Sequence, residues 1–498
     1  MSDNLKQQTK KSIVWSMIDK FGFQVIAFLI GIITMKLILP YDFGLVGALA
    51  IITILSNIFV DSGFTAALVR RQNTTNSEYT SVFYFNLAIS VFLYLILALL
   101  LPAISKFYGK PELVHLGHFL FLGVIINALG IIPNILLVKS FNFKQISLAN
   151  LISAVTAGIA AIWLAIGGAG YWALAWQIIL QNLVRVIIIW YFSKWKPSKK
   201  PVLSVIKELF AFGSILLLTN IISICIKYLY TMLIGKQYSM DDLGQYRQAD
   251  KFQQIPSTIV SGALSSVAYP VFSKLNNEKE RQLLYFRKIT RITAFLIFPM
   301  MFGLIGIAEN FIRVCISDVW LPSVPYLQIL SVSAMFVPFQ SLCLQMFNAI
   351  GKPKCNFYLE MFRNLLIIIS LAICIISVKF SFSPFSVDIK FFENSQSVSV
   401  FLIGFSATAF LAYITNIFVI GKYIKYSLSE HLRDILPYFV IAVAMCLLIF
   451  LTGKLTFNIY IVFVLQLVIG VGFYLGISAF LGSQVLKDAF DIIKKKYD

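Results

Sequence analysis

Charged residues are scarce in this chain of 498 residues, since Asp, Glu, Lys and Arg together make up only 13% of it. Soluble globular domains carry about 25% charged residues. Hydrophobic residues reach 59% and the mean hydropathy is +0.84, which is more apolar surface than one soluble core would bury. The composition therefore excludes an ordinary soluble enzyme and predicts an integral membrane protein.

Acidic residues are few as well, with 22 Asp and Glu against 41 Lys and Arg, so the formal net charge is +19. In a soluble protein such an excess would suggest nucleic acid as the partner, but the apolar composition argues against that class. In a membrane protein, basic residues either set the orientation of the helices or meet an anionic substrate. The distribution of the basic residues along the chain separates these two roles.

Metal-binding and redox residues are also rare. The chain has three His residues and six Cys residues, and it contains no Cys-x-x-Cys pair. His115 and His118 would share a helix face, but no Glu or third ligand accompanies them, as a zinc site requires. The sequence therefore predicts no metal site and no cofactor, and it leaves Na⁺ or H⁺ as candidate coupling ions.

Long hydrophilic segments are missing too. The gaps between apolar segments do not much exceed about 20 residues, and the longest lies around residues 380–398. A membrane glycosyltransferase or an O-unit polymerase would need a substantial catalytic loop outside the bilayer. The loop lengths therefore predict a protein that is not an enzyme.

Apolar runs long enough to cross a bilayer are abundant. A spanning helix needs about 20 mostly apolar residues, and fourteen segments meet this requirement. The weakest of them is the eighth, which is polar enough to resemble a loop. The fourteen segments lie at about 13–35, 43–63, 82–104, 115–137, 147–168, 171–192, 208–229, 253–273, 290–311, 324–347, 357–379, 399–421, 434–453 and 458–482.

Basic residues alternate between the two sides of these predicted helices. With the N-terminus inside, the inner segments hold 28 of the 41 basic residues and the outer segments hold 11, while Lys20 and Arg185 lie within helices. Cytoplasmic loops of membrane proteins are enriched in Lys and Arg. Both termini are therefore predicted to be cytoplasmic, and most of the positive charge sets the orientation.

A weak internal repeat runs at an offset of about 200 residues. The matching motifs are Asp42-Phe43-Gly44 with Asp242-Leu243-Gly244 and Ser62-Gly63 with Ser261-Gly262. Six helices separate the two copies, so the repeat is parallel, about a pseudo-twofold axis normal to the membrane. The predicted fold is all-α, with two six-helix lobes at residues 1–200 and 201–425 and two further helices at 426–498. Asp followed by Gly is ordinary chemistry of turns and helix starts, so we interpret these motifs as features of the fold.

Ionisable side chains within the predicted helices are mostly basic. Each one costs at least about 2.5–3.5 kcal/mol at the bilayer centre, so it must face a cavity or a partner. Arg291 is near enough to a helix end to reach the interface, and Asp61 either binds a coupling cation or pairs with a nearby Lys. The basic side chains that we expect to line a cavity for an anionic substrate are Lys20, Arg185, Arg247, Lys251 and Arg363.

The first five predicted helices contain two long motifs, MKLILPYDFGLVGALAIITILSNIFVDSGFTAALVRR and TNSEYTSVFYFNLAISVFLYLILALLLPAISKFYGKPEL. On these motifs the chain resembles Wzx-type polysaccharide flippases, the O-unit exporters of lipopolysaccharide biosynthesis in the multidrug/oligosaccharidyl-lipid/polysaccharide (MOP) superfamily. The similarity is looser in the second half. The segment DDLGQYRQADKFQQIPSTIVSGALSSVAYPVFSKL is similar to one in the related lipid II flippase. That similarity implies that Lys251 lines a central cavity, with Lys in place of the more usual Arg.

The resemblance implies a flippase of the bacterial cytoplasmic (inner) membrane. Such a protein moves undecaprenyl-diphosphate-linked oligosaccharides by alternating access, for the assembly of O-antigen, capsule or exopolysaccharide, together with other polysaccharide assembly proteins. Arg and Lys in a cavity replace the water around a diphosphate. The main alternative is a multidrug exporter of the same superfamily, whose cationic substrates would require acidic side chains. A membrane glycosyltransferase or O-unit polymerase is the more distant alternative.

Overall fold

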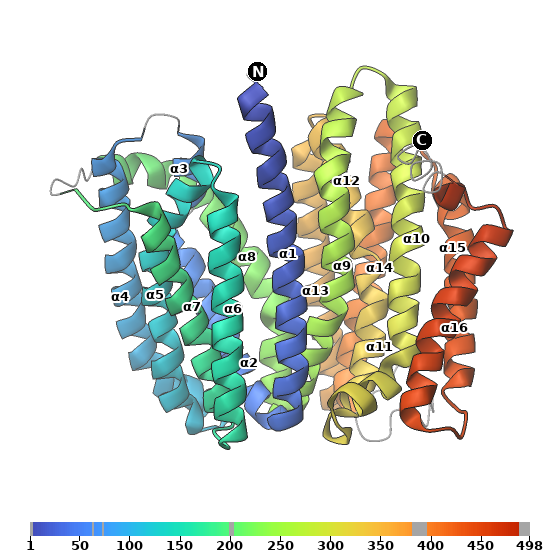
Figure 1. Cartoon of the computed structure of the whole chain (residues 1–498), viewed down its shortest axis with the longest axis horizontal. Coiled ribbons are helices and arrows are strands. Elements are labelled where there is room, and N and C mark those ends of the chain that lie inside the picture. Colours follow the sequence, from blue (N-terminus) through green and yellow to red (C-terminus); the bar gives the residue numbers. More distant parts are fainter. Residues whose placement is uncertain (1–2, 62–63, 72–73, 199–203, 381–395, 488–498) are drawn as a thin grey trace. The chain divides into compact units, whose positions relative to one another are not determined.

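The structure is a computed structural model that describes residues 3–61, 64–71, 74–198, 204–380 and 396–487. Some side chains within these helices lie outside the description. Nearly all of this part is helical, and it contains no strand. Long helices make up each half of the chain (Figure 1). The predicted class, an all-α integral membrane protein, is confirmed.

The chain divides into two compact units, Met1–Gly244 and Gln245–Asp498. The helices of the first unit are α1 (Asp3–Leu37), α2 (Pro40–Asp61), α3 (Phe64–Arg70), α4 (Asn76–Tyr108), α5 (Glu112–Lys139), α6 (Phe143–Ile166), α7 (Tyr171–Ser193) and α8 (Ser204–Gln237). The sequence predicted a first lobe that ends at residue 200, whereas α8 packs against α2, α3 and α4. The first unit therefore includes the helix that was predicted to open the second lobe.

The second unit contains most of α9 and all the helices that follow it. They are α9 (Met240–Lys274), α10 (Lys279–Phe311), η1 (Ile312–Ile316), η2 (Asp318–Trp320), α11 (Ser323–Ala334), α12 (Val337–Ala349), α13 (Pro353–Phe380), α14 (Gln396–Ile424), α15 (Leu428–Thr452) and α16 (Ile459–Phe480). The start of α15 illustrates how local sequence sets a helix end. Ser427 and Glu430 form a capping box, in which each side chain bonds to the backbone N–H of the other.

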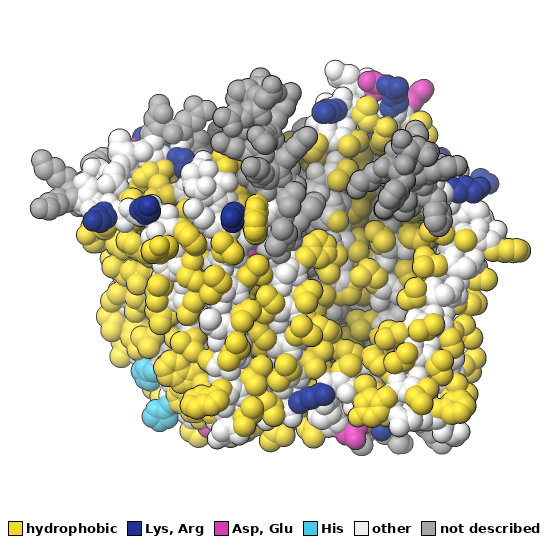
Figure 2. Space-filling model, in the orientation of Figure 1, with side chains coloured by type: hydrophobic (Ala, Val, Ile, Leu, Met, Phe, Trp, Pro, Cys, Tyr) yellow, Lys and Arg dark blue, Asp and Glu magenta, His cyan; other side chains and the backbone are white. Residues whose placement is uncertain are grey.

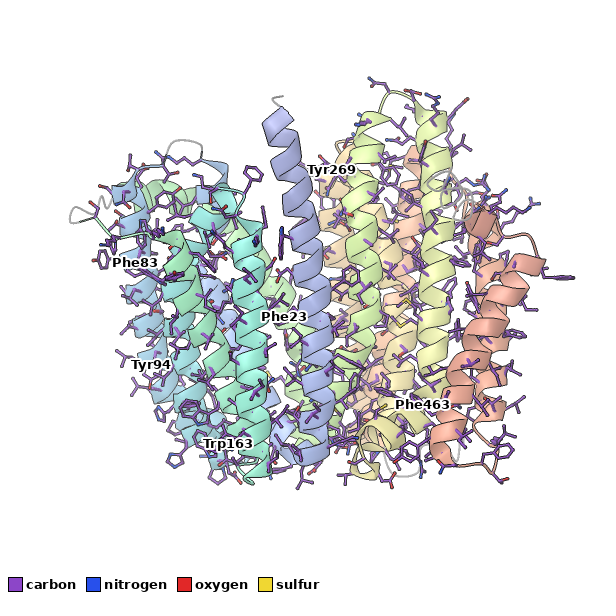
Figure 3. The ribbon with its side chains drawn as sticks, in the orientation of Figure 1. Phe23, Phe83, Tyr94, Trp163, Tyr269 and Phe463 are labelled. Atoms are coloured by element: carbon purple, nitrogen blue, oxygen red, sulfur yellow. The ribbon has the colours of Figure 1, made fainter. Side chains whose placement is uncertain are left out.

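Twelve helices of the described chain are long and apolar enough to cross a membrane. The apolar part of α1 that the structure describes, Phe21–Leu37, is shorter, and α8 contains side chains outside the description, so the total of fourteen stays a prediction. Apolar side chains cover the visible helix flanks, with Lys and Arg toward the helix ends (Figure 2). Trp163, labelled near one end of α6 in Figure 3, is 74% exposed. A surface this apolar suits a hydrocarbon environment.

The polar eighth segment is a regular helix, α9, as predicted, but it begins at Met240 rather than at residue 253. Asp241 and Asp242 lie in its first turn, where carboxylates offset the positive end of the helix dipole. The hydroxyl of Ser239 accepts the backbone N–H of Asp242 at 3.0 Å, which satisfies one of the free donors of that turn. The early start places Arg247 and Lys251 inside the helix.

The predicted span at 324–347 consists of two helices, α11 and α12, joined at Met335 and Phe336. Pro338 lies in the first turn of α12. Proline has no backbone N–H to donate to the preceding turn, and it is tolerated where a helix begins. The break therefore follows directly from the position of this proline.

The two Asp-x-Gly motifs of the repeat meet within the first unit. A Cβ atom on Gly44 would lie 1.9 Å from the carbonyl oxygen of Met240, and a Cβ atom on Gly244 would lie 1.9 Å from the carbonyl oxygen of Pro40. Backbones approach this closely only where glycine has no side chain. The reciprocal contact explains both motifs as features of the fold.

Candidate functional site

Arg185, on α7, is bonded within the first unit. Its Nε donates to Oδ1 of Asn150 at 2.8 Å, and its Nη2 donates to Oδ1 of Asn134 at 3.3 Å. The Nδ2 of Asn150 donates in turn to both carboxylate oxygens of Asp19, at 3.1 Å each. The network joins side chains from α1, α5, α6 and α7, and it links the guanidinium to a carboxylate through one amide. The side chain of Lys20, next to Asp19, lies outside the described residues.

Asp61, the candidate coupling residue, accepts hydrogen bonds at the start of the short helix α3. Its Oδ1 accepts the backbone N–H of Thr65 at 3.2 Å and also accepts the hydroxyl of Thr65. The first N–H groups of a helix have no acceptor inside the helix, and a carboxylate often provides one. The sequence suggested two partners for Asp61, a nearby Lys or a coupling cation. Among the described residues no Lys is bonded to Asp61, and the coupling cation stays a prediction.

Asp61→Asn separates the capping role of this residue from the coupling role. Asn keeps an acceptor oxygen for Thr65, so a capping residue tolerates the change, whereas Asp61→Ala removes the cap and costs about 1 kcal/mol. A coupling residue needs the negative charge, so Asp61→Asn would abolish ion-driven transport. We expect Asp61→Asn to retain the thermal stability of the purified protein. A loss of stability equal to that of Asp61→Ala would contradict the cap.

Arg247 and Lys251 lie one turn apart on α9, in the second unit. Arg247 is half-buried and Lys251 is exposed. The adjacent carboxylate, Asp250, accepts hydrogen bonds from the amides of Gln253 and Gln254 at 2.8 and 2.7 Å. Within the described chain the ammonium of Lys251 has neither a hydrogen-bond partner nor an ion-pair partner. All three of its N–H donors are therefore available to an external anion.

Arg363 lines a cavity of 170 Å³, with mixed polar and apolar lining, among α12, α13 and α14. Its Nη2 donates to Oε1 of Glu360 at 3.1 Å, while its Nε is buried without a hydrogen-bond partner among the described atoms. Side-chain amides from Gln340, Asn356 and Asn416 complete the lining. Ligand pockets usually measure about 300–1,000 Å³, so this cavity has room for only part of a substrate.

The predicted cations thus have different surroundings. Arg185 is held by a network of its own unit, Lys251 is exposed on α9, and Arg363 lies in a separate cavity on α13. Within the described part of the second unit, no hydrogen bond joins Lys251 to Arg363. Their shared role toward an anion stays a prediction.

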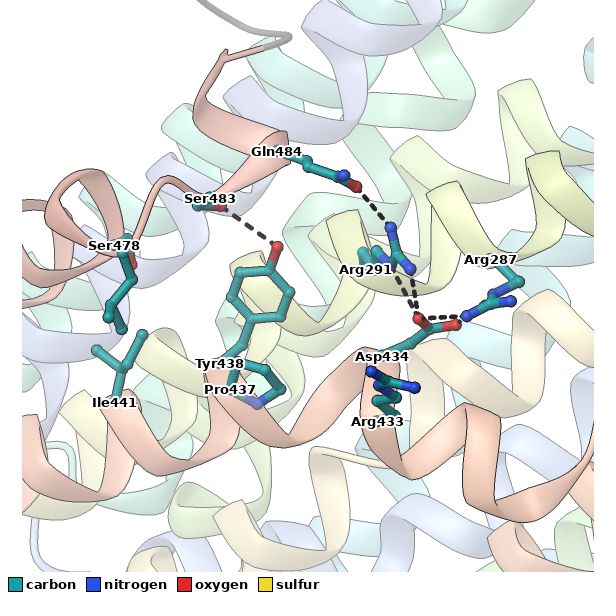
Figure 4. Close-up of a pocket in the computed structure, with 11 residues that line it drawn as sticks. Arg287, Arg291, Arg433, Asp434, Pro437, Tyr438, Ile441, Ser478, Ser483 and Gln484 are labelled. Carbon is teal, nitrogen blue, oxygen red and sulfur yellow. Dashed lines mark hydrogen bonds and ion pairs between the residues drawn. The ribbon is translucent and has the colours of Figure 1, made fainter.

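A buried acid–base cluster in the second unit was not predicted from the sequence. Only 1% of the Asp434 side chain is exposed, and its carboxylate accepts five hydrogen bonds. Figure 4 shows Arg287 and Arg291 pointing toward it. Arg287 donates two of these hydrogen bonds at 2.8 and 3.0 Å, Arg291 donates two at 2.9 and 2.6 Å, and Tyr426 donates one at 2.9 Å. Burial and the charge of Asp434 raise the pKa of the Tyr426 hydroxyl, which therefore remains a neutral donor.

This cluster gives Arg291 a partner that the sequence did not indicate. The sequence suggested a side chain near the interface, and in the structure Arg291 is paired with Asp434. One signal was available, because Arg287 and Arg291 are four residues apart and therefore share a helix face. Their acceptor lies more than 140 residues further along the chain, and no local pattern connects the two segments.

Residues 33–325 match the family described as "Polysaccharide biosynthesis protein". The chain is 28% identical over 366 residues to the succinoglycan biosynthesis transport protein ExoT of Rhizobium meliloti, which covers 72% of this chain and 73% of that protein. It is 23% identical over 380 residues to the lipopolysaccharide biosynthesis protein WzxC of Escherichia coli (strain K12), which covers 74% of this chain and 76% of that protein.

Two kinds of solved structure are similar to this chain. The lipid II flippase MurJ in an inward closed conformation has a TM-score of 0.74 at 18% identity, over 95% of this chain and 100% of that one. An inward-facing multidrug resistance MATE family transporter of the MOP superfamily has a TM-score of 0.61 at 15% identity, over 83% of this chain and 98% of that one. At these identities the similarity shows the fold alone. One of the two structures is a flippase and the other a multidrug transporter, so the fold is compatible with both functions that the sequence left open.

Proposed function

Because this chain belongs to the polysaccharide biosynthesis protein family, we propose that it is a flippase that moves oligosaccharides linked to undecaprenyl diphosphate across the bacterial cytoplasmic membrane. The oligosaccharides serve the assembly of a cell-surface polysaccharide, with both termini of the protein in the cytoplasm. Transport proceeds by alternating access, in which the substrate path opens first to one side of the membrane and then to the other. The protein carries out no catalytic step and works with other polysaccharide assembly proteins.

One observation carries the proposal beyond the family, namely the imbalance between the predicted cations and the carboxylates that lie near them. The carboxylates of Asp19, Asp250 and Glu360 all accept hydrogen bonds from neighbouring side chains. The ammonium of Lys251 and the Nε of Arg363 have no acceptor among the described residues. Charged N–H donors without a partner in the protein bind phosphate oxygens strongly. The imbalance supports an anionic substrate and weighs against a cationic drug.

Removal of the gene tests the proposal directly. We expect lipid-linked oligosaccharides to accumulate in the inner leaflet of the deletion strain, and the surface polysaccharide to disappear. Resistance to cationic dyes should be the same in the deletion strain and its parent. Dye sensitivity without accumulation of the lipid-linked intermediate would reject the flippase in favour of the multidrug exporter.

Lys251→Ala should reduce export in the complemented deletion strain. A hydrogen bond to a charged group contributes about 1.5–3 kcal/mol, so the affinity for the lipid diphosphate should fall about 10- to 150-fold. Lys251→Arg keeps the charge and should retain much of the export. The matched control is Lys279→Ala, which removes an exposed Lys at the first turn of α10. Equal export by Lys251→Ala and Lys279→Ala would remove Lys251 from the substrate site.

Coupling to Na⁺ or H⁺ is the energy source that we propose. Export of the lipid-linked unit into the outer leaflet of sealed vesicles should stop when the coupling gradient is dissipated by an ionophore. Separate ionophores for Na⁺ and H⁺ identify the ion. Transport that survives the loss of both gradients would show that neither ion drives the protein.

A further inference from the structure

A cavity of 440 Å³ opens beside the acid–base cluster, at one end of the second unit. It lies among α10, α15, the end of α16 and the segment that follows α16, and Figure 4 labels most of its lining. A second cavity of 590 Å³ shares Arg287, Arg291 and Gln484 with the first and adds Lys288 and Lys487. The charge distribution along the chain predicts this end to be cytoplasmic.

Cations outnumber carboxylates around these two cavities. The basic lining residues are Arg287, Arg291, Arg433, Lys288 and Lys487, and the acidic residues are Asp434 and Glu430, the latter 3.6 Å from Arg287. Asp434 already accepts five hydrogen bonds, so it has little capacity left for a further cation. Among the described residues Arg433 has no hydrogen-bond or ion-pair partner, although it lines the cavity. The site therefore has positive charge that the described residues do not neutralise.

A buried hydroxyl points to a ligand independently of the charges. Ser478 is 0% exposed and lines the first cavity, and its Oγ has no hydrogen-bond partner in the described part of the chain. Buried polar groups are almost always satisfied. A phosphate or glycerol oxygen in the cavity would supply the missing partner.

An apolar groove lies next to the basic cavity, on the same helices. Its volume is 440 Å³, and its lining comes from α9, α10, α15 and α16. On α10 the face runs from Arg287 and Arg291 through Phe295 and Pro299, at intervals of four residues, into the groove. The rings of Phe295 and Tyr438 touch edge to face, with centroids 5.9 Å apart. This contact joins the groove to the cavity, since Tyr438 lines the latter.

The length of the groove suits one acyl chain. From Phe295 to Ile307 the α10 lining covers twelve residue steps, which is about 18 Å at 1.5 Å per residue. One leaflet of a bilayer has a hydrocarbon depth of about 15 Å, half of the usual 30 Å. A free phosphate ion would use only the basic end, whereas a membrane lipid would use both ends.

We infer that this site binds an anionic glycerophospholipid of the leaflet on its own side of the membrane. The phosphate lies among Arg287, Arg291 and Arg433, and one acyl chain lies in the apolar groove. Basic pockets between transmembrane helices on the cytoplasmic side bind lipid headgroups in this way. The inference concerns a site within the second unit and does not depend on the transported substrate.

The test measures lipid binding to the full-length protein in neutral detergent. Phosphatidylglycerol should bind and raise the temperature of thermal denaturation, whereas phosphatidylcholine and inorganic phosphate should do neither. Arg433→Gln removes a side chain without a described partner in the protein, so the lipid-free stability should stay unchanged. Its affinity for phosphatidylglycerol should fall at least about tenfold, whereas Lys279→Gln, outside the cavity, should bind as the parent does.

Gly303→Leu tests the groove separately. The only heavy atom near a Cβ at this position is Cε of Met445, at 3.7 Å, so the larger side chain would fill the groove without a clash at Cβ. We expect weaker binding of phosphatidylglycerol with the headgroup cations intact. Equal affinity in parent and Arg433→Gln would overturn the inference. So would an equal response to phosphatidylcholine or inorganic phosphate, or binding of undecaprenyl phosphate that excludes phosphatidylglycerol.

Discussion

Gly44→Ala is expected to destabilise the protein and to abolish export in the complemented deletion strain. The added methyl group would lie 1.9 Å from the carbonyl oxygen of Met240, a backbone atom that cannot rotate away. Overpacking of this kind costs typically 1–3 kcal/mol and more in tight sites. We expect about 3 kcal/mol here, because both partners of the contact are helix starts. Gly244→Ala should have the same effect through the carbonyl oxygen of Pro40.

Gly262→Ala is the matched control on α9. A Cβ atom there has no heavy atom within 4 Å, and Ala is a better helix former than Gly by about 1 kcal/mol. Gly44→Ala is therefore expected to lower the stability of the protein, and Gly262→Ala to raise it. Thermal denaturation in detergent and the amount of protein in the membrane measure the difference. If Gly44→Ala left both measurements unchanged, the close approach of the two backbones would be wrong.

Asp434→Ala is expected to lower the thermal stability more than removal of any exposed carboxylate. The change removes the acceptor of five hydrogen bonds. Among the described acceptors, it leaves Arg291 with only the amide oxygen of Gln484 and Arg287 with only the carboxylate of Glu430, at 3.6 Å. Breaking a buried ion pair from one side costs about 3–5 kcal/mol. The side chains of Arg287 and Arg291 are 26% and 31% exposed, so the lower end of this range applies.

Glu309→Ala is the matched control for this prediction. Glu309 pairs with Arg313 at 3.0 Å, and its side chain is 59% exposed, so its loss should cost at most about 0.5 kcal/mol. The loss of stability caused by Asp434→Asn should lie between those of Asp434→Ala and Glu309→Ala, since Asn keeps one acceptor oxygen and loses the charge. Equal denaturation temperatures for Asp434→Ala and Glu309→Ala would show that the cluster contributes nothing to stability.

Local features of the sequence predicted the helices well. The apolar runs identified the spanning segments, because a helix in a bilayer must be apolar over about 20 residues. The polar helix α9 was also predicted, although its start was not, since Asp241 and Asp242 read equally well as a turn. The resemblance to Wzx-type polysaccharide biosynthesis proteins is confirmed by the family match and by the relatives.

The candidate site was less predictable, since sequence identifies a charge but not its partner. Arg185 was expected to face a cavity, and its bonds to Asn150 and Asn134 come from residues 35 and 51 positions away. Lys251 was also expected to face a cavity, and in the structure its ammonium has no partner among the described residues. Nothing in the two local sequences separates these outcomes.

The sequence alone determined the membrane class, the helices and the excess of basic residues, because hydropathy and charge are properties of each segment by itself. The tertiary structure alone decided which of those charges are paired. Asp434 pairs with Arg287 and Arg291 from a helix more than 140 residues away, while Arg433, beside it in the chain, has no such partner among the described residues. Ion pairs form across a few ångströms, and only the packing of distant helices brings the partners within that range.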